Sequence, residues 1–207
     1  MKRFFIATAI LMASLGAYAQ PEAGSLTIQP KIGMNVSNYI GSRDSDPRIG
    51  LAAGAEFEYD FTRRVGLSVG LMYSMQGAKS TIMTFLDLFN YPEYQGKMTY
   101  KTDYINIPIL ANVYVYKGLA LKVGIQPGFN VVSKYTISFG GVDRSGSLSD
   151  IGIDVKSFDF AIPFGISYEI KNVVIDARYN LGVIKIIDHD DSKNSVFQFT
   201  LGYKFGL

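Results

Sequence analysis

The sequence predicts an all-β fold, an eight-stranded antiparallel transmembrane β-barrel of the outer-membrane type. Three observations predict it. Eight segments alternate polar and apolar residues with a period of two, the pattern of strands that have one apolar face. The chain ends inside such a segment, on alternating aromatic residues. It begins with a short apolar stretch typical of an export signal.

The first segment of the chain reads as a secretory signal peptide. Met1 to Arg3 is a short positive region, Phe4 to Leu15 is apolar, and Ala17 to Ala19 is a small-x-small cleavage site. The apolar part is too short to span a hydrocarbon core of about 30 Å. We therefore expect residues 1–19 to be removed and residues 20–207 to form one barrel domain.

The last segment places Phe197, Phe199, Leu201, Tyr203, Phe205 and Leu207 on one face. A strand that ends the chain must pair with another strand or leave an edge prone to aggregation. Gly202, Tyr203, Phe205 and Leu207 follow a pattern that resembles the C-terminal signal by which barrel-assembly machinery recognises its substrates. The chain closes on Leu207, whereas many such proteins close on Phe.

Composition excludes several classes of protein. The chain has no cysteine, so disulfides, thiol chemistry and a lipoprotein anchor are excluded. Loss of Lys2 and Arg3 with the signal leaves 18 basic against 18 acidic residues, and no basic patch predicts nucleic-acid binding. No apolar run of about 18 residues follows the signal, so a transmembrane helix is not predicted. A closed barrel is the remaining way to cross a membrane, because it pairs every backbone polar group between strands.

The predicted strands share the same alternation and are separated by turn residues. They run over Leu26 to Tyr39, Arg48 to Asp60, Arg64 to Gln76, Met98 to Val115, Leu119 to Tyr135, Ser157 to Ile170, Val173 to Ile186 and Ser195 to Phe205.

Glycine decides which face of these strands lies inside. A soluble barrel would place the apolar face inward, around a ligand. Here the strand glycines share the parity of the polar residues, as Gly50 and Gly54 do with Glu56 and Glu58. The interior of an eight-stranded barrel is only just wide enough for side chains to fill, so small residues belong on its concave side. We expect the polar face inside and the apolar face outside, in lipid.

The connectors alternate in length, which supports the same fold. They are long at 41–47, 77–97, 136–156 and 187–194, and short near Thr62, Lys117 and Lys171. Short periplasmic turns and longer extracellular loops are typical of bacterial outer-membrane barrels. An even number of strands then places both termini in the periplasm. Aromatic residues on the outward parity predict girdles, with Tyr59, Tyr168, Tyr203 and Phe205 at the periplasmic rim and Tyr73, Tyr135 and Phe158 at the outer rim.

Three prolines lie inside predicted strands, at Pro108, Pro127 and Pro163. Proline lacks the N–H that a paired strand uses. Our hypothesis is that adjacent strands carry bulges there, and that Tyr114 and Tyr116, which break the alternation after Pro108, mark a register change.

Four strand segments have distinctive sequences, Lys31 to Ser37, Gly66 to Ser74, Tyr104 to Leu110 and Asp176 to Gly182. They resemble the small outer-membrane β-barrel family that is abundant in Bacteroidetes and is called PorT-like. The resemblance covers nearly the whole chain after the signal, and it implies a barrel scaffold without implying a reaction. One member gave the family its name through a link to protein secretion.

Charged residues on the inward parity are the first candidate site. One interpretation is a mutually satisfied polar core, because charges removed from water need partners. The other is a narrow, charge-lined conduit. We favour the polar core, since a barrel of this size is filled by its own side chains. The network is expected to contain Glu56, Glu58, Lys122, Glu169, Asp176 and Arg178.

The 77–97 connector is the second candidate site, because it carries a cluster of large apolar residues. Such clusters mark contact with a partner, a ligand or a membrane surface. Alternatively, the segment extends its two flanking strands as a hairpin or folds over the barrel mouth. The candidate contact residues are Phe85, Leu88, Phe89, Tyr91 and Tyr94.

His189 is the single histidine, in the run Asp188 to Ser192. A histidine beside carboxylates and a serine would suit a surface hydrolase, but neighbours in a loop do not provide an oriented nucleophile and base. A solvated acidic loop is the favoured interpretation. Cation binding by Asp188, Asp190 and Asp191, bridging lipopolysaccharide phosphates, is the alternative, although a full oxygen cage is missing.

These features predict a non-enzymatic outer-membrane protein that acts through its extracellular loops and needs no cofactor. The expected partners are outer-membrane lipid, lipopolysaccharide, the barrel-assembly machinery and a protein at the loops. The alternatives are a narrow pore, an uptake or secretion accessory, and a surface hydrolase.

Overall fold

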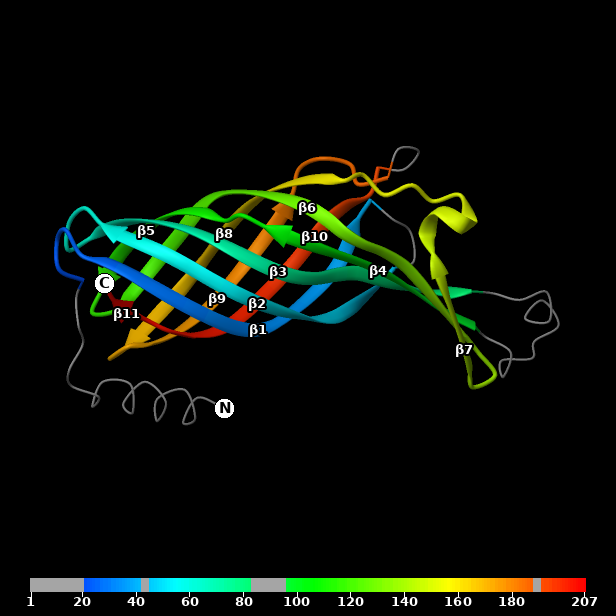
Figure 1. Cartoon of the computed structure of the whole chain (residues 1–207), viewed down its shortest axis with the longest axis horizontal. Coiled ribbons are helices and arrows are strands. Elements are labelled where there is room, and N and C mark those ends of the chain that lie inside the picture. Colours follow the sequence, from blue (N-terminus) through cyan, green and yellow to red (C-terminus); the bar gives the residue numbers. More distant parts are fainter. Residues whose placement is uncertain (1–20, 42–44, 83–95, 188–190) are drawn as a thin grey trace, which may run out of the picture.

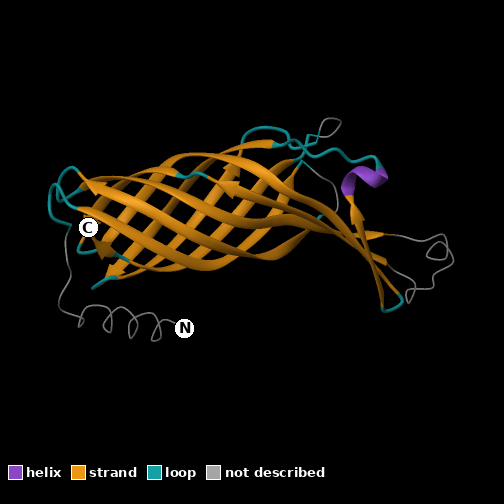
Figure 2. Cartoon of the chain, in the orientation of Figure 1, coloured by secondary structure: helices purple, strands orange, loops and turns teal. Residues whose placement is uncertain are grey.

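A computed structural model describes residues 21–41, 45–82, 96–187 and 191–207, which form an elongated antiparallel barrel (Figures 1 and 2). The predicted signal peptide lies outside the described residues. No helix in the described ranges is long and apolar enough to cross a membrane. The strands are β1 (Leu26–Ile40), β2 (Asp46–Asp60), β3 (Val65–Ile82), β4 (Gly96–Asn106), β5 (Ile109–Tyr116), β6 (Leu119–Phe139), β7 (Val142–Ser147), β8 (Phe158–Ile170), β9 (Val173–Gly182), β10 (Lys193–Tyr203) and β11 (Phe205–Gly206).

These segments make a closed ring of eight strand positions. β4 and β5 are two consecutive segments of one strand of the ring, and both pair with β3 and β6. In the same way, β10 and β11 are consecutive segments of the last strand, and both pair with β1. Pairing of β10 with β1, from Lys31 with Gly202 to Ile40 with Lys193, closes the ring. The remaining strand, β7, pairs with the end of β6. The predicted eight-stranded barrel is therefore confirmed.

The two ends of the barrel differ. At the turn end, short connections join β2 to β3, β5 to β6 and β8 to β9, and the C-terminus lies there (Figure 1). At the loop end, β3 and β4 remain paired out to Ile82 and Gly96, and β6 continues into the hairpin with β7. A 3-10 helix, Leu148–Ile151, follows β7. Strands therefore extend into the described parts of the predicted 77–97 and 136–156 loops. We call the paired segments 77–82, 96–102, 133–139 and 142–147 the loop-end sheet.

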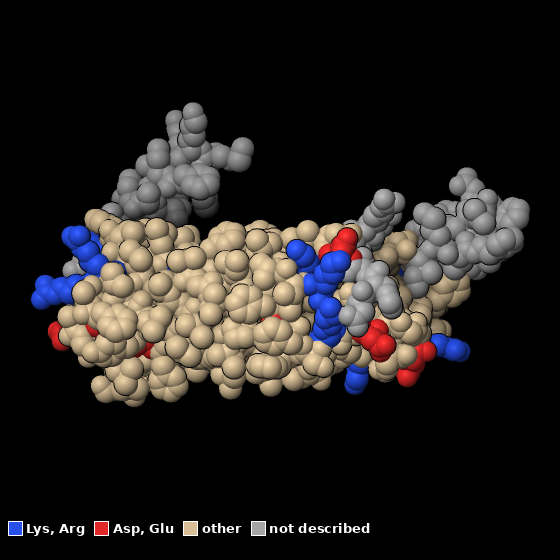
Figure 3. All heavy atoms as spheres, turned by 90° about the horizontal axis from the view of Figure 1, so that it is seen from above, with Lys and Arg blue, Asp and Glu red and all other residues tan. Residues whose placement is uncertain are grey.

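The outer wall of the barrel is apolar and its interior is polar. Ile32, Leu71 and Phe164 are about half exposed, at 58%, 59% and 48%, and many similar side chains surround them. Figure 3 shows this wall as a broad, mostly uncharged surface with Lys, Arg, Asp and Glu gathered at the two ends. Because an isolated soluble protein would bury such side chains, this wall is the lipid-facing surface of a membrane barrel.

Close approach of neighbouring strands explains the inward glycines. A Cβ built on Gly33 would lie 1.9 Å from the carbonyl oxygen of Phe199 in β10. A Cβ on Gly70 would lie 2.5 Å from the Glu56 Cγ, inside the lumen. A larger residue at either position would need the backbone or a charged side chain to move.

The bulge hypothesis for the prolines is wrong. The register of pairing with β3 is the same at Asn106, before Pro108, and at Ile109, after it. The register of pairing with β6 is also unchanged between these two residues. The Pro108 carbonyl accepts a hydrogen bond from the Gly70 N–H at 2.9 Å, and the missing proline N–H costs a single bond without displacing the strand. The register between β8 and β9 is likewise unchanged across Pro163 of β8. The register between β6 and β8 is unchanged across Pro127 of β6.

The register irregularities lie elsewhere. One falls between Tyr114 and Tyr116, where we expected a change, although Tyr114 itself stays on the inward parity. Another falls at Asp103 and Tyr104, where β6 has Val131 as an extra residue. Because of this extra residue, Tyr135 lies opposite Tyr100 and shares the face of the inward residues of β4. The prediction that Tyr135 belongs to the outer aromatic girdle is therefore wrong.

The underside of the loop-end sheet packs against the barrel mouth. Tyr39 of β1, Ala78 of β3 and Ile186 form a buried apolar cluster, with Tyr100 and Ile187 packed against it. Ile186 belongs to a connection rather than to β9, which ends at Gly182 and not at Ile186 as expected. These contacts attach the base of the loop-end sheet, which projects beyond the barrel (Figure 1), to the barrel mouth.

Candidate functional site

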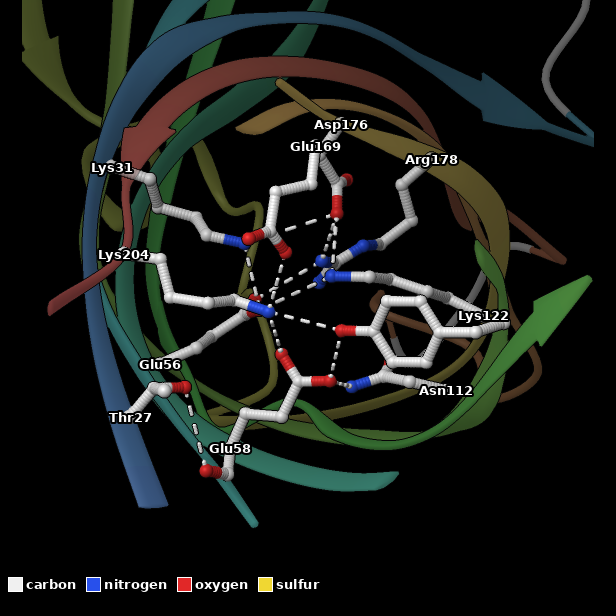
Figure 4. Close-up of polar contacts among 11 residues, drawn as sticks. Thr27, Lys31, Glu56, Glu58, Asn112, Lys122, Glu169, Asp176, Arg178 and Lys204 are labelled. Carbon is white, nitrogen blue, oxygen red and sulfur yellow. Dashed lines mark hydrogen bonds and ion pairs between the residues drawn. The ribbon is translucent and has the colours of Figure 1, made fainter. Parts of the chain in front are cut away.

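A network of charged side chains crosses the lumen near its middle (Figure 4). We call Lys31, Glu56, Lys122, Asp176 and Arg178 the central cluster. They come from β1, β2, β6 and β9, so the cluster ties walls that are far apart around the ring. Strand alternation aims each of them inward, and all five are buried.

Short contacts connect every member of the central cluster. Arg178 Nη2 donates to Glu56 Oε1 and to Asp176 Oδ2, each at 3.0 Å. Lys31 Nζ lies 2.6 Å from Glu56 Oε2, and Lys122 Nζ lies 3.1 Å from Asp176 Oδ2. Longer contacts of 3.8 Å and 3.9 Å join Lys31 to Asp176 and Lys122 to Glu56. Each carboxylate therefore meets all three cations.

A second group lies toward the turn end, and we call it the turn-end cluster. Lys204 Nζ lies 3.0 Å from Glu58 Oε2 and 3.0 Å from Glu169 Oε2, and it donates to the Tyr114 hydroxyl at 2.9 Å. Glu58 Oε1 accepts from the Tyr114 hydroxyl at 2.7 Å and from Asn112 Nδ2 at 2.8 Å. Every member is buried.

The two clusters balance one another electrically. The central cluster has three cations and two carboxylates, whereas the turn-end cluster has one cation and two carboxylates. Together they hold equal numbers of each sign. Removing one partner from such a set leaves an uncompensated buried charge, which is strongly destabilising. The network can fix the shape of the lumen, because its side chains meet there from strands on different sides of the ring.

Not every polar atom in the lumen has a protein partner. Asp176 Oδ1, Arg178 Nε and Asn180 Oδ1 are buried without a hydrogen bond to any described residue. Groups of this kind are ordinarily satisfied by buried water. A cavity of about 550 Å³ also opens at the turn end, lined in part by Thr27, Asp60 and Lys204.

A smaller polar group lies toward the loop end. Arg48 Nη1 lies 3.3 Å from Asp103 Oδ1, and the Tyr73 hydroxyl donates to Asp103 Oδ2 at 2.8 Å. Asn194 Nδ2 donates to Asp159 Oδ2 at 2.8 Å. Polar contacts therefore continue beyond the central cluster toward the loop end of the barrel.

The structure divides the six charged residues predicted for the lumen between the two clusters. Glu56, Lys122, Asp176 and Arg178 meet in the central cluster, while Glu58 and Glu169 meet at Lys204. The sequence analysis missed Lys31, Lys204, Tyr114 and Asn112. Lys31 shares parity with Gly33 and Lys204 with Gly202, so the same glycine argument could have found both.

The C-terminal residues form the end of the barrel wall. Gly202 faces the lumen against Gln29, whereas Tyr203, Phe205 and Leu207 are exposed. The Leu207 N–H donates to the Leu26 carbonyl at 2.9 Å, so the last residue is still paired with β1. Recognition of this segment by assembly machinery remains a prediction.

Two predicted loop sites lie outside the described residues. They are the apolar group of Phe85, Leu88, Phe89, Tyr91 and Tyr94, and the run of Asp188, His189 and Asp190. Asp191, at the edge of that run, pairs with Lys185, and the hydrogen bond from this ammonium lowers the pKa of the exposed Asp191 carboxyl. The described residues contain no group of three or more His, Cys, Asp or Glu side chains that could hold a metal ion.

The closed ring, the apolar wall and the charged lumen define a transmembrane β-barrel of the outer-membrane class. A family model described as outer membrane protein beta-barrel domain matches residues 18–188, and the chain belongs to this family. The family places the protein in the outer membrane. No curated protein sequence matches the chain.

Solved barrels with similar folds have low sequence identity to the chain. The attachment invasion locus protein Ail of Yersinia pestis is 16% identical, with a TM-score of 0.47, and the match covers 88% of this chain and 99% of that one. Neisserial surface protein A is 13% identical, with a TM-score of 0.48, over 87% and 97%. OprG of Pseudomonas aeruginosa is 13% identical, with a TM-score of 0.45, over 89% and 97%.

Proposed function

We propose that the protein is a non-enzymatic outer-membrane barrel whose lumen is closed and which acts through its loop-end sheet. In this proposal the loop end faces the outside, and the turn end with both termini faces the periplasm. The partners are outer-leaflet lipopolysaccharide and a protein at the loop end, and barrel-assembly machinery inserts the chain. No cofactor takes part.

The central cluster is the observation that carries this proposal. Its five side chains meet across the lumen from four strands, with contacts of 2.6 to 3.9 Å. A transported solute would have to separate these ion pairs inside the barrel, which costs several kcal/mol. The barrel therefore suits an anchor, and the paired strands beyond the wall suit recognition.

A narrow pore is the second candidate, and a specific observation favours it. Asp176 Oδ1 and Arg178 Nε have no partner among the described residues, and the turn-end cavity leads toward the Lys204 ammonium. A chain of water through these groups would carry small ions. A role as an uptake or secretion accessory rests on the resemblance to PorT-like proteins alone.

Single-channel recording in planar lipid bilayers tests the proposal. We expect the wild-type protein to give no steady conductance. Glu56→Ala/Arg178→Ala, which removes the contact between β2 and β9 across the lumen, should give measurable current. A matched control, Arg63→Ala/Arg64→Ala, changes two exposed arginines of a turn and should stay silent. Steady current through the wild-type barrel would favour the pore instead.

Gentle extraction from the native membrane tests the interaction role. We expect a partner to co-purify with wild-type protein and to be lost when the β6–β7 hairpin is replaced by a short turn. Recovery of the same partner with that shortened barrel would exclude the hairpin as its contact surface.

A further inference from the structure

One face of the loop-end sheet is basic and continues the lipid-facing wall. Residues directly opposite one another on paired strands share a face. Register therefore puts Lys101 of β4 beside Lys134 of β6, and Lys79 of β3 beside Thr99 of β4. Lys97 lies two residues further along β4 from Thr99. We call Lys79, Lys97, Lys101 and Lys134 the lysine face.

Lys101 and Lys134 are an unfavourable pair without a counter-ion. They are Cα partners in the register, and like charges directly opposite one another destabilise a sheet. In the described ranges neither forms an ion pair with a carboxylate. Their neighbours on the same face are hydroxyl residues, among them Thr99, Thr136 and Ser147. Two ammonium groups among hydroxyls form a surface suited to an anion.

The acidic residues of this face leave the lysine pair unneutralised. Asp46 lies opposite Lys79, and Asp143 lies opposite Ser138, away from the pair. Asp103, two residues along β4 from Lys101, is already bound by Arg48 and by the Tyr73 hydroxyl. No described carboxylate pairs with Lys101 or Lys134, so an anion from outside the described chain can supply the charge that offsets them.

The height of the lysine pair above the apolar wall indicates what supplies that charge. Ile105 and Val131 are exposed apolar residues of the wall. Toward the loop end, Lys101 lies four positions from Ile105 along β4, and Lys134 lies three positions from Val131 along β6. A strand rises about 3.3 Å per residue and a barrel strand tilts by about 40°, so the backbone at Lys134 and Lys101 stands roughly 8 and 10 Å beyond these two residues. The headgroup layer extends about 5–8 Å beyond the hydrocarbon on each side of a bilayer, which is within reach of lysine side chains at that height.

We propose that the lysine face binds the phosphate groups of a glycolipid in the outer leaflet. This rests on the proposed orientation, in which the loop end faces outside. Charge complementarity and continuity with the lipid-facing wall select a lipid headgroup over a soluble anion, because a lipid anchored against Ile105 and Val131 brings its phosphates to Lys101 and Lys134. Bound phosphate then removes the repulsion within the lysine pair.

Thermal unfolding of the full chain in phosphatidylcholine nanodiscs, with and without purified lipopolysaccharide, tests the proposal. Lipopolysaccharide should raise the unfolding midpoint of the wild type, because a ligand that binds the folded state stabilises it. Lys101→Gln/Lys134→Gln should bind roughly thirtyfold more weakly, since each of the two lysines near a lipid surface contributes about 1 kcal/mol. Without lipopolysaccharide, the same variant should be at least as stable as the wild type.

Three controls separate the outcomes. Arg63→Gln/Arg64→Gln, at the turn end, should respond to lipopolysaccharide as the wild type does. Dephosphorylated lipopolysaccharide should stabilise neither protein, and inorganic phosphate at equal phosphate concentration should have little effect. Equal binding by Lys101→Gln/Lys134→Gln and wild type would overturn the proposal, and so would equal stabilisation by inorganic phosphate. Neither result bears on whether the lumen conducts, which the bilayer recording decides separately.

Discussion

Arg178 and Glu56 are separated by 122 residues in the sequence, yet Arg178 Nη2 donates to Glu56 Oε1 at 3.0 Å inside the barrel. The same nitrogen donates to Asp176 Oδ2, so one guanidinium joins β9 to β2 across the lumen. Such a contact forms only when the ring is closed, because β2 and β9 are not neighbours in the sheet. The central cluster therefore couples closure of the barrel to the pairing of its charges.

We expect Glu56→Gln to destabilise the folded barrel by about 3 kcal/mol, because Lys31, Lys122 and Arg178 would then share a single carboxylate. Urea unfolding in lipid vesicles measures the loss. The double variant Glu56→Gln/Arg178→Met, which removes one charge of each sign, should recover part of it. If the losses of unfolding free energy for Glu56→Gln and Arg178→Met simply sum in the double variant, the two residues are not coupled.

Gly33 gives a prediction about strand packing. We expect Gly33→Ala to lower stability by roughly 1–3 kcal/mol, because its Cβ would meet Phe199 and Thr200 backbone atoms at 1.9 Å and 2.6 Å and β10 would have to move. Gly206→Ala is a matched control, since a Cβ there has nothing within 4 Å. The fraction of folded protein on an unheated gel reports both. Equal folding of the two variants would contradict the role of Gly33.

The barrel could be predicted because one physical constraint, a narrow interior inside a lipid-facing wall, acts on every strand. This constraint places Gly33, Gly54 and Glu56 on the inward face of their strands, and the alternation of polar and apolar residues makes that face recognisable in the sequence. The partners of each charge could not be predicted in this way. Parity says that Glu58 and Glu169 point inward, but their meeting at Lys204 depends on the stagger of strands around the ring.

The failed predictions have local causes. Pro108 reads as a strand breaker, yet its ring sits over Gly70, where a Cβ would lie 3.3 Å from the proline Cγ, and the register passes through unchanged. Tyr114 breaks the alternation, and the expected register change does follow it, yet the side chain stays inward because its hydroxyl binds Glu58 and Lys204. In both cases the side chain is explained by one partner on another strand, which alternation does not reveal.

Lys204 gives a prediction for the turn-end cluster. We expect Lys204→Met to destabilise the barrel by about 3 kcal/mol, because Glu58 and Glu169 would lose the ammonium that lies 3.0 Å from each. Adding Glu169→Gln should restore part of the stability, since one buried charge is then removed. Lys117→Met, in an exposed turn at the same end, is the control, and urea unfolding compares all three. An equal loss for Lys117→Met and Lys204→Met would refute a specific role for Lys204.

Phe164, in the middle of β8, tests whether the apolar wall faces lipid. The side chain is 48% exposed and packs on Tyr179 with ring centroids 5.3 Å apart. We expect Phe164→Arg to destabilise the folded state by about 2–4 kcal/mol in lipid vesicles, the cost of a charge on the lipid face near the bilayer midplane. Val142→Arg places the same charge on an exposed residue of β7, beyond the membrane, and should cost less than about 1 kcal/mol. Unfolding in urea from vesicles of matched composition measures both.

The loss of stability for Phe164→Arg should also grow as lipids with longer acyl chains bury the position more deeply. A loss that is independent of the lipid would mean that Phe164 acts through its contact with Tyr179 alone.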